Sequence, residues 1–422
     1  MEGGEAEAGP SPGDGAVLAS LLAAGGPGGT GPAVSAPALR AIRRHLGMEV
    51  AFLSEFVDGR RVFRAVDAPG ADPPVRVGEG DPLEESYCQR VVDGRLPELI
   101  HDARAVPAAA ELPATRSLPV GAHLSVPVRL ADGRVYGTFC CFSTSPDLSL
   151  NERDLAMMRV FAELTAAQID ADRAAGRRRA EAAARVRSAM AGEGLSMVYQ
   201  PIVDIDRRRP VGFEALARFS GRPPRGPDAW FAEAGEAGLG VELELAAVAL
   251  ALRDRPRLPT AAYLALNVSP ATVLSGRLDA LLADRRADPV VLEITEHEAV
   301  GSYERLDGAL ARLRRSGVRV AVDDAGAGYA SFRHILRVRP DVIKLDMSLT
   351  RRIDEDGARR ALALALIRFA AETGSDLVAE GVETPGELRT LRELGATVAQ
   401  GNLLGHPADG ARLGRSGTTG GG

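Results

Sequence analysis

The second half of the chain alternates between two kinds of segment, and this alternation constrains the fold more than any other feature. Between residues 195 and 413, short apolar runs typical of β-strands are separated by amphipathic stretches such as Tyr303–Arg315 and Ala358–Thr373. Repeated strand-then-helix units predict a parallel sheet, because parallel strands need a long crossover connection. The strand-like runs are Val198–Val203, Val211–Phe219, Ala262–Asn267, Val290–Ile294, Val318–Asp323, Asp341–Leu345, Asp376–Glu380 and Thr397–Gln400. Eight such runs suit a closed α/β barrel of the (β/α)8 type.

Polar side chains lie at the ends of these runs. In a barrel of this type the carboxyl ends of the strands meet at one rim, where chemistry is carried out. Six runs carry such a residue at or near the end, and the Val211–Phe219 run holds Glu214 in its middle. The residues at the ends are Asn267, Glu293 with Glu296, Asp323 with Asp324, Lys344 with Asp346, Glu380 with Glu383, and Gln400. We therefore expect these side chains to converge on one rim.

Several carboxylates on one rim need positive partners. Their charges repel one another, and burial would raise their pKa values. Hard cations between them relieve the repulsion, and the oxygen ligands of Asp, Glu and Asn suit magnesium, manganese or calcium. Two such ions can clamp a phosphodiester and lower the pKa of a water molecule. Any one of these acids alone is equally compatible with an ordinary solvated rim residue.

Lys344 is the only lysine in the chain, since every other Lys or Arg is Arg. A solvated cation on the surface can evidently be Arg in this protein. A position that keeps Lys suggests a need for a compact ammonium group, with chance retention as the alternative. Among acids, such an ammonium could stabilise developing charge or orient a nucleophile.

Seven motifs in the second half together resemble the EAL phosphodiesterases. They are Glu214-Ala215-Leu216-Ala217-Arg218, which gives that family its name, Asn267 in LALNVSP, Glu293 and Glu296 in LEITEH, Asp323-Asp324 in DDAGAGYAS, Lys344-Leu345-Asp346, Glu380-Gly381-Val382-Glu383, and Gln400-Gly401 with Pro407 following. The resemblance spans residues 199–407 and is specific because all seven occur in order. It implies a TIM-like EAL barrel that hydrolyses cyclic di-GMP to linear pGpG with two Mg²⁺ or Mn²⁺ ions per active site.

The resemblance also implies a role for each matching residue. Glu214, Asn267, Glu293 and Asp323 would bind the first metal, and Asp323 would bridge to a second metal held also by Asp324 and Glu380. Lys344 would be the catalytic lysine near the attacking water, with Glu214 and Glu380 as further catalytic residues. Arg218 would contact a substrate phosphate, and Gln400 and Asn402 would lie at the substrate. Asp346 and Glu383 would support the site together with Gln400, and Glu296 would hold the loop after Asp324, which often lies at a dimer interface in the family.

Two positions depart from the family pattern. Ala325 stands where a phenylalanine is usual, which could loosen the coupling of that loop to a dimer interface. Asn402 stands where an aromatic residue is usual, near the base-binding region, so the affinity for guanine could differ. Neither change removes a ligand or Lys344.

Two other functions remain alternatives at this stage. One is a non-catalytic receptor that binds cyclic di-GMP and signals through a protein partner. The other is a different enzyme on the same barrel, since a fold does not fix a function. The sequence contains no GGDEF-like cyclase segment, no Gly-rich phosphate loop of the usual barrel type and no Ser/His/Asp set.

The first half of the chain has the pattern of an α+β domain. A helical segment, Pro37–His45, precedes the strand-like runs Val50–Phe56, Arg61–Ala65, Ala122–Arg129 and Val135–Phe142, and a long helix starts at Asn151. The pairs Asp58-Gly59 and Asp132-Gly133 indicate turns, and the second predicts a hairpin. The segments 86–92, 137–142 and 148–164, with that hairpin, resemble a GAF sensory domain, whose sheet and helices enclose a pocket for a small ligand. Cys88, His101 and His123 could line such a pocket, with core packing or surface exposure as the alternative.

These patterns divide the chain into five parts. Residues 1–33 and 414–422, rich in Gly and other small residues, are expected to be disordered or flexible. Residues 34–170 form the GAF-like domain, 171–194 a helical connector and 195–413 the EAL barrel. Because the helical pattern is nearly continuous between the domains, the sensor is expected to regulate the barrel through the connector.

Composition restricts the partners and the compartment. The formal net charge of −6 gives no basic footprint for nucleic acid. No apolar run approaches the length of a membrane span, and the acidic N-terminal segment does not fit a signal peptide. The three cysteines, Cys88, Cys140 and Cys141, lack zinc-binding spacing and predict reduced thiols in a cytoplasmic protein, with a redox role for the adjacent pair Cys140–Cys141 as the alternative. The expected partners are cyclic di-GMP, a second copy of the chain, and an unidentified small molecule, or none, at the GAF-like domain.

Overall fold

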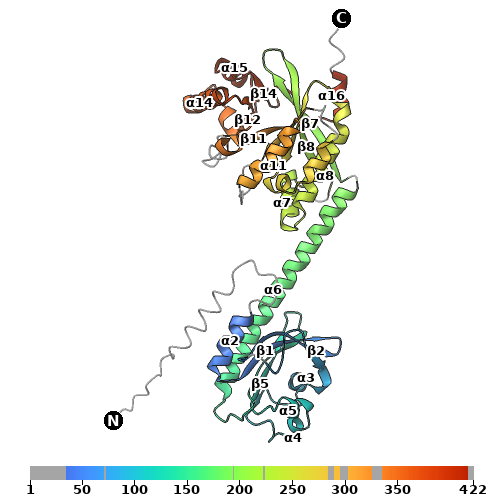
Figure 1. Ribbon diagram of the computed structural model, residues 1–422, viewed down its shortest axis with the longest axis vertical. Coiled ribbons are helices and arrows are strands. Elements are labelled where there is room, and N and C mark those ends of the chain that lie inside the picture. The colour runs from blue at the N-terminus through green and yellow to red at the C-terminus, as the bar shows by residue number, and fades with distance from the viewer. Residues whose placement is uncertain are drawn as a thin grey trace, which may run out of the picture. The chain divides into compact units, whose positions relative to one another are not determined.

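The structure is a computed structural model that describes residues 35–70, 73–192, 194–221, 224–283, 289–294, 303–325 and 335–416 (Figure 1). The chain forms two compact units, Met1–Arg177 and Arg178–Gly422. The predicted disordered segment 1–33 lies outside the described residues. Helix α16 (Gly410–Ser416) takes in residues 414–416 of the predicted flexible tail, and residues 417–422 are not described. The finer domain boundaries expected from the sequence remain predictions.

The first unit is built on one antiparallel sheet of six strands in the order β3-β2-β1-β6-β5-β4. The strands are β1 (Val50–Val57), β2 (Arg60–Asp67), β3 (Gly80–Pro82), β4 (Leu99–Ile100), β5 (His123–Arg129) and β6 (Val135–Phe142). The helices are α2 (Ser35–His45), η1 (Leu83–Glu85), α3 (Tyr87–Val92), α4 (Pro107–Ala110), α5 (Pro113–Ser117) and the long α6 (Glu152–Ala191). This arrangement confirms the predicted α+β domain.

The two faces of this sheet carry separate hydrophobic cores. Leu53 and Cys141 pack on one face with residues of α2 and α6, whereas Phe52 and Cys140 pack on the other face with residues of α3 to α5. Neighbouring residues of a strand point to opposite faces, which produces this division. Figure 1 shows α2 and α6 on one side of the sheet and α3 to α5 on the other.

Both predicted turns of the first unit are present. β1 and β2 are joined through Asp58 and Gly59, whose φ angles are 49° and 72°. Two consecutive residues with positive φ are the requirement of a two-residue hairpin turn, which an Asp-Gly pair meets with little strain. The turn between β5 and β6 contains Gly133, also with positive φ, so the predicted hairpin is confirmed.

The second unit contains a closed eight-stranded barrel in the order β10-β11-β12-β13-β14-β7-β8-β9, as predicted. Its strands are β7 (Leu195–Asp204), β8 (Arg209–Phe219), β9 (Tyr263–Val268), β10 (Val290–Ile294), β11 (Arg319–Ala325), β12 (Val342–Leu345), β13 (Asp376–Ala379) and β14 (Val398–Gln400). The described helices around it are α7 (Pro227–Glu236), α8 (Gly240–Asp254), η2 (Arg255–Arg257), α9 (Pro270–Leu274), α10 (Arg277–Leu282), α11 (Tyr303–Arg315), α13 (Met347–Thr350), α14 (Gly357–Thr373), α15 (Pro385–Glu393) and α16.

The expectation of an all-parallel barrel is wrong for one strand. β7 pairs antiparallel with both of its neighbours, β8 and β14. Only a short turn, residues 205–208, separates β7 from β8. A connection of that length can join antiparallel strands but cannot make the crossover that parallel strands require.

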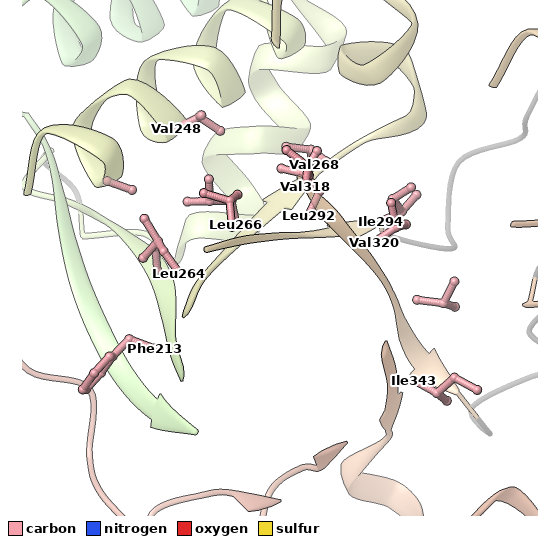
Figure 2. Packing of buried hydrophobic residues seen from close by; sticks show 14 of the residues in the cluster. Phe213, Val248, Leu264, Leu266, Val268, Leu292, Ile294, Val318, Val320 and Ile343 are labelled. Atoms are coloured by element: carbon pink, nitrogen blue, oxygen red, sulfur yellow. The ribbon is translucent and has the colours of Figure 1, made fainter. Parts of the chain in front are cut away.

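The barrel has a packed interior of small and branched side chains and a larger core outside it. Ile202, Ala265, Val291, Ala321, Val342 and Val378 form the inner cluster. Residues such as Leu264, Leu266 and Leu292, next to them along the strands, pack outward against the helices (Figure 2). This alternation fixes which side chains face the barrel interior.

The predicted connector is helical, since α6 extends from Glu152 to Ala191.

Among the described helices, none is sufficiently long and apolar to cross a membrane.

Candidate metal and substrate site

The candidate site lies one layer above the inner apolar cluster, on the same face of the strands. Each parallel strand carries a polar residue two positions after a member of that cluster, or after a residue that packs on it (Val398) or pairs with it across the sheet (Gly212). A two-residue step along a strand returns a side chain to the same face. The pairs are Gly212 and Glu214, Ala265 and Asn267, Val291 and Glu293, Ala321 and Asp323, Val342 and Lys344, Val378 and Glu380, and Val398 and Gln400. The barrel therefore brings together residues that are far apart in the chain, such as Glu214 and Gln400, which are 186 positions apart.

Lys344 lies at the centre of this layer and is 1% exposed. Its Nζ is 2.6 Å from Glu380 Oε1 and 2.7 Å from Glu293 Oε2. Asp323 Oδ1 lies at 3.2 Å and Glu214 Oε1 at 3.7 Å. One ammonium group thus faces four carboxyl groups, and the cluster carries excess negative charge when these groups are ionised.

Glu214 is fixed by side-chain amides as well as by Lys344. Asn267 donates from Nδ2 to Glu214 Oε1 at 2.8 Å, and Gln400 donates from Nε2 to Glu214 Oε2 at 2.6 Å. Gln400 also donates to Gln200 Oε1 at 3.1 Å, and Gln200 Nε2 in turn donates to the backbone oxygen of Gly405 at 3.2 Å. This chain of hydrogen bonds orients the carboxyl group of Glu214.

Gln200 is a member of the site that sequence reasoning missed. On the antiparallel strand β7 it lies two residues before Ile202 of the inner cluster, whereas the other site residues lie two residues after theirs. A reversed strand presents its earlier residues to this rim. The two-residue spacing between Gln200 and Ile202 could have identified Gln200 only if the direction of β7 had been known.

Burial and Lys344 act against each other on the pKa values of the acids. Burial raises the pKa of Glu293 well above its ordinary value, although the charge of Lys344 opposes this shift. Burial likewise raises the pKa of Glu380 to about 8, again against Lys344. Burial also favours a raised pKa at Glu214, but the charge of Lys344 and the hydrogen bonds from Gln400 and Asn267 outweigh it and lower the pKa. Burial would lower the pKa of Lys344, but the surrounding carboxylates raise it well above its usual value, so this residue stays charged.

The acids at this rim fit divalent cations with oxygen ligands. Oxygen atoms of Asp323, Asp324 and Glu380 lie within 4.8 Å of one another. Asp324 has a φ angle of 55°, a conformation that is uncommon for residues other than glycine, and its backbone N–H donates to Asp323 Oδ1 at 3.0 Å. The Oε1 atom of Gln400 is buried without a hydrogen-bond partner among the described residues. Excess negative charge, oxygen donors and a buried acceptor together match Mg²⁺ or Mn²⁺.

A cavity of about 930 Å³ opens beside this cluster. Asn267 and Asp323 of the cluster line it, and so does Arg218, which lies four residues after Glu214 on β8. The other lining residues include apolar side chains such as Phe231 and the carboxyl group of Glu244. The cavity therefore joins an apolar compartment to the acidic rim through an arginine.

The remaining predicted site residues are not among the four carboxyl groups around Lys344. Asp346 caps α13, accepting from Ser348 N at 2.9 Å. Glu383 is 44% exposed and pairs with Arg351 at 2.7 Å, so it faces away from the buried carboxyl groups. Asn402 is exposed and does not line the cavity. Ala325 is buried at the end of β11, and Glu296 lies outside the described residues.

Comparison with known proteins identifies the barrel. Residues 183–407 match the EAL domain family. The chain belongs to the EAL family. Residues 33–170 match the GAF domain family, so the first unit is a GAF domain, as the sequence predicted.

Related EAL proteins are named as phosphodiesterases. The probable cyclic di-GMP phosphodiesterase PdeD of Escherichia coli is 32% identical over 222 residues, which are 49% of this chain and 40% of PdeD. The cyclic di-GMP phosphodiesterase NbdA of Pseudomonas aeruginosa is 31% identical over 236 residues, 53% of this chain and 30% of NbdA. This chain thus spans well under half the length of these relatives. The solved structure of the PaMucR phosphodiesterase in complex with c-di-GMP has a TM-score of 0.50 and 27% identity, covering 55% of this chain and 99% of that chain.

Proposed function

We propose that the EAL barrel hydrolyses cyclic di-GMP to linear pGpG with the help of two divalent metal ions. The observation that carries this proposal is the set of four carboxyl groups around Lys344 beside a cavity that Arg218 lines. The names of PdeD, NbdA and PaMucR support the choice of substrate.

The residues that would hold the metal ions fall into two overlapping groups. Glu214, Asn267, Glu293 and Asp323 would hold one ion, and Asp323, Asp324 and Glu380 the other. When bound, the ions would supply charge neutralisation at the phosphodiester and make a bound water molecule more acidic. Mg²⁺ and Mn²⁺ both suit this set of donors.

Three residues of the chain have proposed roles in the hydrolysis. Arg218 binds a phosphate oxygen and so places the ester bond at the acidic rim. Glu380 is the carboxyl group adjacent to Lys344 that would take a proton from the attacking water. Lys344 then stabilises the negative charge that develops as water adds to phosphorus and one phosphoester bond breaks. The leaving oxygen takes up a proton, and the product is a linear dinucleotide.

The apolar part of the cavity would bind a portion of the substrate away from the reacting phosphate. Arg218, Asn267 and Asp323 at its edge connect that portion to the acidic rim. Asn402 does not line this cavity. Its proposed contact with the substrate therefore requires a ligand that extends beyond the cavity.

The GAF domain is proposed to regulate the barrel through α6. The helix contains residues of both compact units, from Glu152 to Ala191. Comparing the full chain with a variant that lacks residues 1–170 tests this proposal. We expect the rate of hydrolysis or the oligomeric state to differ between the two, and equality of both would refute it.

The hydrolysis itself is tested with purified full chain, cyclic di-GMP and either MgCl₂ or MnCl₂, followed by chromatography of the products. We expect pGpG with the wild type, and none after chelation or in Glu214→Gln. Asp206→Asn is the matched control, since Asp206 is an exposed acid in the turn after β7, at the opposite rim of the barrel. Bound but uncut substrate in the presence of metal would favour the alternative function, a cyclic di-GMP receptor that signals through a protein partner.

A further inference from the structure

Two cysteines that are far apart in the sequence are in contact inside the GAF domain. Cys88 lies on α3 and Cys140 on β6, and their Sγ atoms are 3.6 Å apart. Neither side chain has any exposed surface. The two thiols are therefore held together by the packing of α3 against the sheet.

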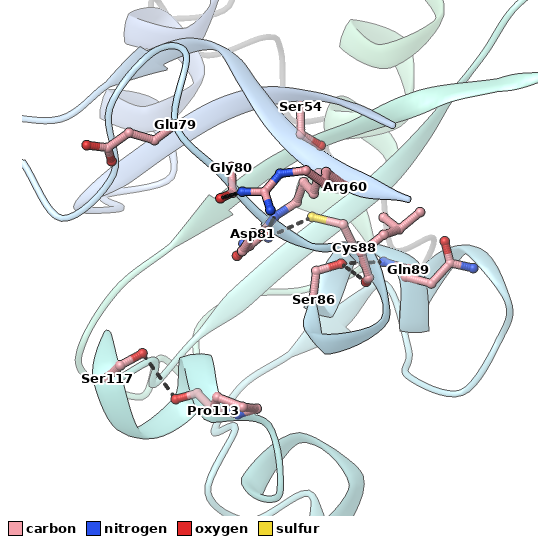
Figure 3. Close-up of polar contacts among 12 residues, drawn as sticks. Ser54, Arg60, Glu79, Gly80, Asp81, Ser86, Cys88, Gln89, Pro113 and Ser117 are labelled. Atoms are coloured by element: carbon pink, nitrogen blue, oxygen red, sulfur yellow. Dashed lines mark hydrogen bonds and ion pairs between the residues drawn. The ribbon is translucent and has the colours of Figure 1, made fainter. Parts of the chain in front are cut away.

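A buried cation also contacts Cys88. Arg61 of β2 is 4% exposed and donates from Nη1 to Cys88 Sγ at 3.1 Å. Its Nε donates to Asp81 Oδ1 at 2.9 Å, and its Nη2 contacts the other oxygen of Asp81. Figure 3 shows Cys88 and Asp81 in this polar region. Asp81 holds the guanidinium group in place, so the cation is fixed against the sulfur atom.

The surroundings of the two thiols are unequal. Burial would raise the pKa of Cys88, but the hydrogen bond with Cys140 and the charge of Arg61 outweigh it and lower the pKa to about 5. Burial and the neighbouring Cys88 raise the pKa of Cys140. Cys140 instead contacts the hydroxyl groups of Ser125 and Thr138, at 3.0 Å and 3.1 Å. Cys88 is thus the sulfur suited to be a nucleophile, and Cys140 the thiol within reach of it.

Cys141 takes no part in this arrangement. As the neighbour of Cys140 on a strand it points to the opposite face of the sheet, where its Sγ lies 3.9 Å from the sulfur of Met158. Cys140 and Cys141, whose redox role was the alternative to the predicted reduced thiols, therefore lie on opposite faces of the sheet, and Cys140 contacts Cys88 instead.

We propose that Cys88 and Cys140 form a redox modification site that a small hydroperoxide converts into a disulfide. The Cys88 thiolate attacks one oxygen of hydrogen peroxide, the O–O bond breaks, and a sulfenic acid and hydroxide form. The sulfur of Cys140 then attacks Cys88 Sγ, and the sulfenic hydroxyl group leaves and takes up the thiol proton as water. The hydroxide from the first step takes up the proton that Cys88 lost on ionising. In sum, two thiols lose two electrons to the peroxide, and two water molecules form. Full burial restricts the oxidant to a small molecule.

The disulfide is tested in the full chain carrying Cys141→Ser, because Cys140 and Cys141 lie in one tryptic peptide, residues 135–153. The protein is treated with hydrogen peroxide, its free thiols are alkylated under denaturing conditions, and the unreduced digest is examined by mass spectrometry. We expect residues 77–90 linked to residues 135–153, loss of both alkylatable thiols, and recovery of both after dithiothreitol. If Cys141→Ser does not fold, the wild type is used, and fragment ions distinguish Cys140 from Cys141.

Single variants separate the two steps. In Cys140→Ser, Cys88 is expected to stop at the sulfenic acid and to be trapped by dimedone, whereas Cys88→Ser should yield neither adduct nor intramolecular disulfide. Full alkylation of both cysteines after peroxide, links between two chains only, or dimedone labelling of Cys140 in place of Cys88 would each overturn the proposal.

Discussion

At the scale of single residues, Lys344 sets the balance of positive and negative charge in the site. It is the one lysine of the chain, and it lies within 3.7 Å of four carboxyl groups in the barrel. An arginine has a planar, forked head that could not occupy the same central position among four acids. This geometry accounts for the retention of a lysine in a chain whose other cations are arginines.

Replacing Lys344 with methionine keeps the length of the side chain and removes its charge. We expect the free energy of unfolding of the barrel to fall by about 3 kcal/mol without metal, because buried carboxylates lose their cation. Turnover of cyclic di-GMP should fall at least about a hundredfold. Trp230, the only tryptophan, lies in α7 and reports barrel unfolding in denaturant. An unchanged midpoint would show that Lys344 does not stabilise the cluster.

Gln200 provides a second test at this scale. In Gln200→Ala, Gln400 loses one of its acceptors and Glu214 loses part of its orientation. Since residues that orient ligands contribute about 10- to 100-fold, we expect a loss of turnover of that size with little change in the unfolding midpoint. The assay compares this variant with Asp206→Asn at saturating metal. Wild-type turnover would contradict the proposed positioning role.

At the scale of elements, strand period and helix caps place the site residues. The loop after β13 carries Glu380, and the N-terminus of α15 holds that loop through Glu387. The buried carboxyl group of Glu387 accepts from the backbone N–H groups of Glu383 and Thr384 at 2.8 Å and 2.9 Å, and from that of Arg352 at 2.9 Å. Thr384 completes a capping box with Glu387.

The cap predicts a dependence of stability on pH. Burial would raise the pKa of Glu387, but its backbone hydrogen bonds outweigh this and hold the pKa below the ordinary 4.5. Its contribution is thus complete above pH 4.5 and is lost as the pH falls through the folded-state pKa. We expect Glu387→Gln to lower the free energy of barrel unfolding by about 1–3 kcal/mol at neutral pH. This deficit should shrink below pH 4.5, measured by Trp230 fluorescence in denaturant.

Glu355→Gln is the control for this measurement, because Glu355 is 63% exposed and its ion pair is with the exposed side chain of Arg352, whose backbone N–H and not its side chain contacts Glu387. We expect it to leave the midpoint unchanged at every pH. A deficit of Glu387→Gln that stays constant into the acid range would mean that Glu387 stabilises the cap without its charge.

At the scale of the whole molecule, the two compact units should respond separately to metal. Excess Mg²⁺ or Mn²⁺, at a hundred times its Kd, should stabilise the barrel by about 2.7 kcal/mol if it binds only the folded state. Calorimetry of the full chain is expected to show one transition that rises with metal and one that does not, with Trp230 fluorescence following the first. Asp323→Asn should abolish the rise. A parallel shift of both transitions would show that the units unfold together.

Local sequence patterns determined the fold class and the residue types of the site. The two-residue period of the strands, the Asp-Gly turns and the order of the seven motifs are properties of short segments, so they can be read without knowing what each segment contacts. These patterns predicted the barrel, the α+β domain and, except for Gln200, the polar side chains that surround Lys344 and Glu214, and the resemblance to known families predicted the GAF and EAL domains.

Only the tertiary structure decided how distant segments meet. The reversed direction of β7 brings Gln200 into the site, the packing of α3 on the sheet places Cys88 against Cys140, and the pairing with Arg351 turns Glu383 outward. Each outcome depends on which remote surfaces bury one another, and a periodic pattern within one segment carries no information about its distant partner. For this reason the sequence determined which residues could act, and the fold decided which of them share a site.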